Sequence, residues 1–172
     1  IGSLIGLTGA LFPLLLVGKG WPIFAGFAIV LILAMTIGLV HGLLITKLKL
    51  QPFIVTLCGL FIYRGIARYM TGEMNQGFGN SFGNLRQLVK FKVFGFIPMP
   101  FMNLIIVGII AAVFLNRTTY GRYLLALGRN ESAARYSGIN TDRMAIVAYI
   151  ICSLLAGVGG ILFALEQNSV QP

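Results

Sequence analysis

Long, uninterrupted apolar runs separated by short polar or glycine-rich segments dominate the chain. A helix needs about 20 mostly apolar residues, with roughly 17 to 25 tolerated, to cross the hydrocarbon core of a membrane. Because lipid offers the backbone no hydrogen-bond partners, uninterrupted runs of this length predict helices and not the alternating strands of a barrel. The pattern therefore predicts an all-α integral membrane protein, a polytopic transmembrane helix bundle of about five spans in one domain. These spans are residues 1–17, 21–46, 53–70, 99–116 and 144–165 of 1–172.

Composition supports a lipid environment. The chain is 58% hydrophobic and 10% charged, whereas a soluble domain carries roughly 25% charged residues. Its net charge of +9 comes from 13 basic residues against four acidic ones. The basic residues flank the apolar runs in short segments, which favours anchoring at the membrane surface. Nucleic-acid binding would need them clustered on one soluble face, so no nucleic-acid partner is expected.

The chain offers few residues for catalysis or metal binding. With four acidic residues and one histidine, it shows no carboxylate pair, catalytic triad or zinc constellation. Cys58 and Cys152 lie inside apolar runs and are not interpreted as a disulfide or a metal pair. His41, near the inner end of the second span, is interpreted as an interfacial histidine and not as a proton relay. We therefore predict no catalytic residue, metal or cofactor in this chain, and no enzyme activity of its own.

Small residues recur at four-residue spacing within the apolar runs. Such pairs allow helix backbones to approach closely, so together they favour a packed bundle over isolated anchors. The pairs are Gly6/Ala10, Gly38/Gly42, Gly108/Ala112 and Ala156/Gly160.

Charge predicts the orientation of the spans. If the spans alternate, seven basic residues, among them Lys47, lie on one side and four on the other. The positive-inside rule then places residues 117–143 in the cytoplasm and residues 71–98 outside. If Arg64 and Arg68, near the outer end of the third span, are included, the inner side has seven basic residues and the outer side six. The glycine-rich outer segment fits either an external loop or a compact cap over an entrance.

The polar segment before the fifth span contains the signals of a short helix, residues 131–137. Asn130 is a favoured N-cap, and Glu131 places negative charge where the helix dipole favours it. Two alanines follow, and Gly138 stands where a left-handed residue ends a helix. Residues 140–142 offer a second N-cap. Since a helix shorter than about 12 residues is marginal in water, this one must dock on the membrane surface, the end of the bundle or another protein.

Two stretches carry a resemblance to a known family. One begins "TTYGRYLLALGRNESAARYSGINTDR" and continues through a serine- and glycine-rich span; the other is "QPFIVTLCGLFIYRGIA", residues 51–67. Together they resemble the permease subunits of ribose-type ABC sugar importers, a family of binding-protein-dependent transport permeases. In the first stretch the pattern rests on Gly121, Arg122, Ala126, Gly128, Asn130, Ala133, Ala134, Gly138, Ile139, Arg143, Ser153, Gly157, Gly159 and Gly160.

The resemblance covers essentially the whole chain and departs from the family at two positions. Cys58 stands where small residues are usual, and Glu73 stands where a second glycine is common. Both bear on the outer, substrate-facing end, so they leave the identity of the substrate open. The family has further spans at both ends, so the chain is expected to be an internal fragment of a longer permease.

The resemblance implies a multi-pass transport subunit of the bacterial inner membrane. In the family the permease pairs with a second copy, identical or different, and a periplasmic or extracellular binding protein delivers the sugar. ATPase subunits, which bind ATP-Mg, dock on the cytoplasmic face, so residues 117–143 would form the coupling loop. By this resemblance the ATPase-facing residues are Asn130, Glu131, Ala133, Ala134, Arg135, Tyr136 and Gly138.

The favoured solute is a monosaccharide similar to ribose, xylose or galactose. Thr56, Tyr63 and Ser153 can offer hydrogen bonds to sugar hydroxyls, although each can equally bond its own helix backbone. Related importers of branched-chain amino acids or nucleosides are the nearest alternatives. A passive channel and a structural membrane subunit without a path of its own are alternatives from other classes.

Overall fold

The computed structural model describes residues 1–75, 77–78, 92–93, 97–167 and 170. Its secondary structure is almost wholly helical, which confirms the all-α prediction. The described strands are β1, Lys92–Val93, and β2, Ile97–Pro98, which pair antiparallel. The helices are α1 (Gly2–Pro13) with the π-helical turn η1 (Leu14–Gly18), α2 (Ile23–Thr46), α3 (Pro52–Thr71), α5 (Met99–Arg117), α6 (Thr119–Arg129), α7 (Glu131–Tyr136) and α8 (Thr141–Gln167).

A helix lies at the position of each of the five predicted spans, although their crossing of a membrane stays a prediction. Among the described residues, α2, α3 and α8 are each long and apolar enough to cross a membrane. A fourth span results if α5 and α6, which meet at an angle of 83°, are counted as one. The first predicted span corresponds to a shorter apolar helix, Gly2–Gly18. The predicted outer segment, residues 71–98, lies mostly outside the described residues, so its interpretation as loop or cap stays open.

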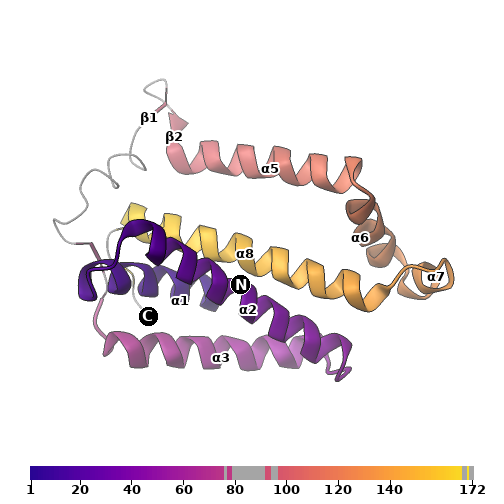
Figure 1. The fold of residues 1–172 in the computed structure, drawn as a ribbon, viewed down its shortest axis with the longest axis horizontal. Coiled ribbons are helices and arrows are strands. Elements are labelled where there is room, and N and C mark those ends of the chain that lie inside the picture. Colours follow the sequence, from indigo (N-terminus) through magenta and orange to yellow (C-terminus); the bar gives the residue numbers. More distant parts are fainter. Residues whose placement is uncertain (76, 79–91, 94–96, 168–169, 171–172) are drawn as a thin grey trace.

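Helix α8 is the centre of the bundle and packs along both α1 and α2 (Figure 1). Its crossing with α2 is close because α2 presents glycines there. A Cβ atom at Gly38 would lie 2.7 Å from the backbone oxygen of Tyr149, and one at Gly42 would lie 2.9 Å from Cα of Ile146. The Gly38/Gly42 prediction is therefore confirmed. Gly6 and Gly108, by contrast, have no such neighbour among the described residues.

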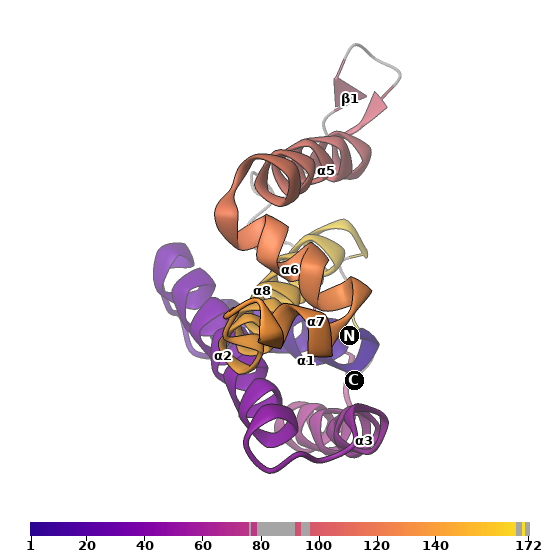
Figure 2. The same ribbon diagram turned by 90° about the vertical axis from the view of Figure 1, so that its right-hand side faces the viewer.

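Helix α5 stands apart from α1, α2, α3 and α8 and is joined to them through α6 (Figures 1 and 2). The break between α5 and α6 lies at Thr118, whose hydroxyl oxygen accepts a hydrogen bond from the backbone N–H of Gly121 (3.0 Å) as an N-cap. Gly121 then lies against the backbone of Phe114 and Leu115, where a Cβ atom would collide. A glycine at this position therefore permits the sharp bend.

The α2–α3 connection and α7 lie at the same end of the bundle (Figure 1). Lys47, which follows α2, forms an ion pair with Asp142 at the start of α8, with 3.9 Å between Nζ and Oδ2. This ion pair agrees with the prediction, made from the alternation of spans, that Lys47 and residues 117–143 lie on the same side of the membrane. That this side is the cytoplasm stays a prediction.

Candidate functional site

The first candidate site is the short helix α7, which is capped at both ends as predicted. The Asn130 side-chain oxygen accepts a hydrogen bond from the Ala133 backbone N–H at 3.0 Å. At the other end, the N–H of Gly138 donates to the carbonyl of Arg135, and the N–H of Ile139 donates to that of Ala134, both at 3.1 Å. With Gly138 at φ +80°, these two bonds form a Schellman motif. The helix ends at Tyr136, one residue before the predicted end.

Arg135 ties α7 to the start of α8. Its Nη2 atom donates a hydrogen bond to the hydroxyl of Thr141 at 3.0 Å. The same atom lies 3.4 Å from a carboxylate oxygen of Glu131 and 3.5 Å from one of Asp142. Because the Arg135 side chain is 61% exposed, these ion pairs add little stability. The effect of the contacts with Thr141 and Asp142 is geometric, since they hold α7 against the start of α8; the Glu131 pair lies within α7.

One side of α7 packs inward and the other faces outward. Ala134 is 4% exposed, whereas Tyr136 is 93% exposed; Ala133 is also exposed. The sequence predicted that α7 packs on the membrane surface, the end of the bundle or another protein. The structure shows that its Ala134 face packs on the end of the bundle. The outward side remains available to another surface, and an exposed tyrosine is a residue type enriched where proteins bind one another.

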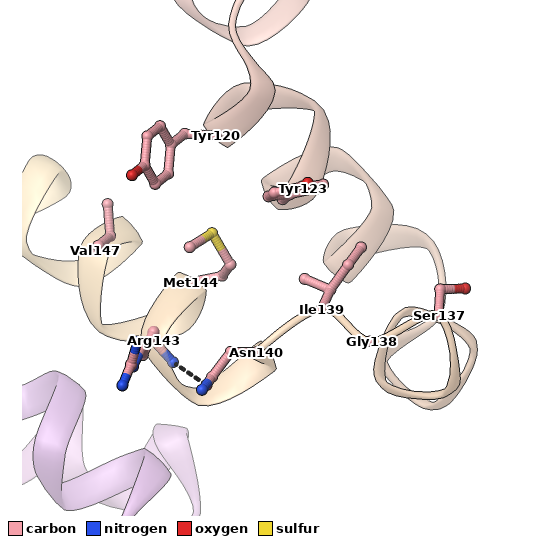
Figure 3. Close-up of a pocket in the computed structure, with 9 residues that line it drawn as sticks. All are labelled: Tyr120, Tyr123, Ser137, Gly138, Ile139, Asn140, Arg143, Met144 and Val147. Carbon is pink, nitrogen blue, oxygen red and sulfur yellow. Dashed lines mark hydrogen bonds between the residues drawn. The ribbon is translucent and has the colours of Figure 1, made fainter.

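A cavity of about 580 Å³ lies beside α7, between α6 and α8 (Figure 3). Tyr120 and Tyr123 line it from α6, and Met144 lines it from α8 (Figure 3). The Asn140 side-chain oxygen accepts from the Arg143 backbone N–H at 3.1 Å and so caps α8, as predicted. Sequence reasoning missed this cavity because it did not predict α6. The N-cap residue Thr118 three positions before Gly121 was the signal that could have revealed the helix.

The second candidate site, which we call the central cavity, lies between α1, α2, α3 and α8 and has a volume of about 190 Å³. It brings together Thr56, Tyr63 and Ser153, the three residues proposed from sequence for the substrate path. None of the described residues that line it is acidic, lysine or arginine. They are Ile1, Ser3, Leu4, Ile37, His41, Thr56, Tyr63, Tyr149, Cys152 and Ser153.

The central cavity also contains His41, which sequence reasoning did not include. His41 Nε2 lies 3.0 Å from the hydroxyl oxygen of Tyr63, a hydrogen-bond distance, and the ring centroids are 5.6 Å apart. The contact shows that the His41 ring is partly buried against α3, while its position at the membrane interface stays a prediction. Only the packing of α2 on α3 reveals this pair, since 22 residues separate the two side chains in sequence.

The three path residues differ in hydrogen bonding. The Thr56 hydroxyl donates to its own helix, with the carbonyls of Pro52 and Phe53 at 2.9 and 3.1 Å. Tyr63 is paired with His41. Ser153 is only 8% exposed, and within the described part of the chain its hydroxyl forms no hydrogen bond. A buried hydroxyl without a partner is uncommon in proteins and points to an unmet requirement for a ligand or a water.

The whole chain, residues 1–172, matches one family model, described as "Branched-chain amino acid transport system / permease component". The ribose import permease protein of Escherichia coli (strain K12) is 35% identical over 174 residues, which cover 100% of this chain and 54% of that protein. The fructose import permease protein of Bifidobacterium longum (strain NCC 2705) is 31% identical over 167 residues, covering 95% and 46%.

The L-arabinose transport system permease protein of Escherichia coli (strain K12) is 34% identical over 133 residues, covering 77% of this chain and 40% of that protein. The chain thus spans about half the length of the curated relatives it matches. No solved structure matches it.

Proposed function

Because the chain belongs to the family described as the permease component of branched-chain amino acid transport systems, we propose that it forms the membrane path of an ATP-driven importer for a monosaccharide. The observation that carries this proposal is α7. It is a capped helix of six residues at the end of the bundle, fixed to α8 through Arg135 and exposing Tyr136. These are the properties required of a helix that a docked soluble partner displaces.

The proposed mechanism is alternating access. An ATPase subunit docks on the outward side of α7 and binds ATP-Mg itself; nucleotide-driven closure then displaces α7. The contacts of Arg135 with Thr141 and Asp142 pass this displacement to α8. Ser153 lies twelve residues along α8 from Thr141, or about 18 Å at 1.5 Å per residue. A rigid α8 therefore links the docking helix to the central cavity.

The central cavity favours a monosaccharide over an amino acid. A zwitterionic amino acid carries two charges, which need charged or strongly polar partners when they are taken out of water. The described lining of the cavity supplies hydroxyls and one imidazole but no acidic or basic side chain of the Asp, Glu, Lys or Arg type. A nucleoside, which joins a base to a pentose, is larger than a monosaccharide and fits a volume of about 190 Å³ less well. The names of the relatives, which refer to ribose, fructose and L-arabinose, agree with this choice.

The proposal includes the remaining partners of such an importer. They are a second permease copy, a periplasmic or extracellular binding protein that delivers the sugar, and the lipid of the bacterial inner membrane. A passive channel would transport without an ATPase and would not need α7. A structural subunit would have no site for a solute.

A crosslinking experiment tests the proposal. In the full-length permease with its native cysteines replaced, a cysteine is placed at Ser132, on the exposed side of α7. The matched control is Tyr69→Cys, since Tyr69 is 90% exposed and lies near the opposite end of the bundle. We expect an ATP-dependent crosslink to the ATPase from position 132 and none from position 69. Labelling of position 132 from outside the cell would overturn both the orientation and the proposed docking.

A further inference from the structure

We propose that His41, Tyr63 and Ser153 form the hydrogen-bonding site of the central cavity, and that an uncharged, hydroxyl-rich solute binds there by replacing the His41–Tyr63 hydrogen bond. This inference rests on the proposed function and makes it more specific. It adds His41 as a solute-contacting residue and Gly59 as the position that makes the pair possible.

The first observation is the space that Gly59 provides. A Cβ atom at position 59 would lie 2.8 Å from His41 Nε2 and 3.0 Å from Cε2 of Tyr63. Both distances are at or below the closest approach that real Cβ atoms show. A side chain at this position would therefore displace one or both rings. Gly65, six residues further along α3, has no atom within 4 Å of such a Cβ, so of these two glycines only Gly59 is closely approached.

The second observation is the buried hydroxyl of Ser153. It is held close to α2, because a Cβ atom at Gly38 would lie 2.8 Å from Ser153 Oγ. The side chain lines the central cavity, is more than nine-tenths buried, and within the described residues forms no hydrogen bond. This independent observation points to a ligand, since a bound hydroxyl would satisfy a group that the protein itself does not.

The chemistry of these groups selects the class of ligand. Tyrosine and serine hydroxyls can each donate and accept, and a neutral imidazole donates at one nitrogen and accepts at the other. Sugar hydroxyls also donate and accept, so they match this set. Leu4 and Ile37 add apolar surface to the cavity, as suits the C–H faces of a sugar ring. The described lining offers no group to balance a net charge, so an uncharged ligand is selected.

Binding would change the contact between α2 and α3. In the structure, the two helices are joined by the direct bond between His41 and Tyr63. A solute hydroxyl that inserts between the rings can accept from one and donate to the other, so one direct bond becomes two bonds through the solute. The separation of α2 and α3 would then depend on whether the cavity is occupied.

The native Cys152 is exposed and lines both the central cavity and an apolar pocket between α5 and α8. The part of its labelling that a sugar prevents therefore reports binding in the central cavity. The experiment uses the full-length permease with its ATPase and binding protein in proteoliposomes, with all other cysteines replaced. The rate of maleimide labelling of Cys152 is measured with and without ribose, L-arabinose or fructose. Uptake of the same radiolabelled sugars and ATP hydrolysis are measured in parallel. We expect the transported sugar to slow labelling at least threefold.

Three variants remove single hydrogen-bonding groups: His41→Leu, Tyr63→Phe and Ser153→Ala. For each we expect loss of sugar protection and a fall in uptake of about threefold to tenfold, the range that the loss of one neutral hydrogen bond produces. ATP hydrolysis should change less, because α7 and its contacts are untouched. His41→Gln, which retains a donor and an acceptor, should restore part of the uptake. Gly59→Ala should act like His41→Leu, whereas Gly65→Ala should act like the unsubstituted protein.

The outcomes separate the inference from the proposed function. If the unsubstituted protein imports one of the sugars with ATP, but neither His41→Leu nor Ser153→Ala alters uptake or protection of Cys152, this site is wrong and the importer stands. If the unsubstituted protein imports none of the three sugars, the proposed function itself fails for this class of solute.

Discussion

Replacing Gly38 with alanine should disrupt the crossing of α2 and α8. The added Cβ atom would lie 2.7 Å from the Tyr149 backbone oxygen and 2.8 Å from both Cα of Ile150 and Oγ of Ser153. Two of these three neighbours are backbone atoms, so rotation of a side chain cannot relieve the overlap. Inserting a methyl group into such a packed site typically costs about 1–3 kcal/mol. We therefore expect Gly38→Ala to lower the free energy of unfolding by that amount.

The matched control is Gly65→Ala in α3, where the added methyl group meets no atom within 4 Å. Alanine is a better helix former than glycine by up to about 1 kcal/mol, so this substitution should leave stability unchanged or raise it. The assay is SDS-induced unfolding of the full-length permease in mixed micelles, followed by circular dichroism. If Gly38→Ala unfolds at the same SDS fraction as Gly65→Ala, the close crossing of α2 and α8 is refuted.

Three further predictions concern α7, its contacts with α8, and the bend between α5 and α6. Ala133→Arg, on the exposed side of α7, should lower uptake severalfold in the transport assay and leave SDS unfolding unchanged. Ala134→Arg, at a buried position, should lower both uptake and stability. Arg135→Ala should reduce uptake per ATP hydrolysed but cost less than about 1 kcal/mol of stability, because its ion pairs are exposed. Gly121→Ala should change the distance between spin labels on α5 and α6, since its Cβ atom would collide with the α5 backbone; Gly128→Ala, in open space, should not.

The features that the sequence predicted correctly depend on local chemistry. Apolar runs fix the lengths of membrane-crossing helices, and caps depend on two or three neighbouring residues. Asn130 and Gly138 therefore revealed both ends of α7. The Gly38/Gly42 pair was predictable for a similar reason, because its spacing places both glycines on one face of the helix.

The features that the sequence did not reveal depend on packing between distant segments. Nothing near His41 in the sequence indicates Tyr63 as its partner, and nothing near Ser153 indicates that its hydroxyl lies buried against α2. The spacing pattern also selected Gly6 and Gly108, which have open space beside them, as readily as Gly38. Small-residue spacing shows where two helices can approach, but only the arrangement of the bundle decides where they do.

In the proposed mechanism the two candidate sites are connected through the close crossing of α2 and α8. At their crossing the backbone of α2 at Gly38 and Gly42 lies against backbone atoms of Tyr149, Ile150 and Ile146 in α8. Lys47 and Asp142 add a second tie at the end that carries α7. In that mechanism, a displacement of α7 would therefore reach α2 as well as α8. Helix α3 packs mainly on α1 and contacts α2 less extensively, with His41 and Tyr63 as the polar link. If the solute binds as we propose, exchange of that hydrogen bond for bonds to the solute would be the step at which α3 moves relative to α2 and α8 and the cavity between them opens.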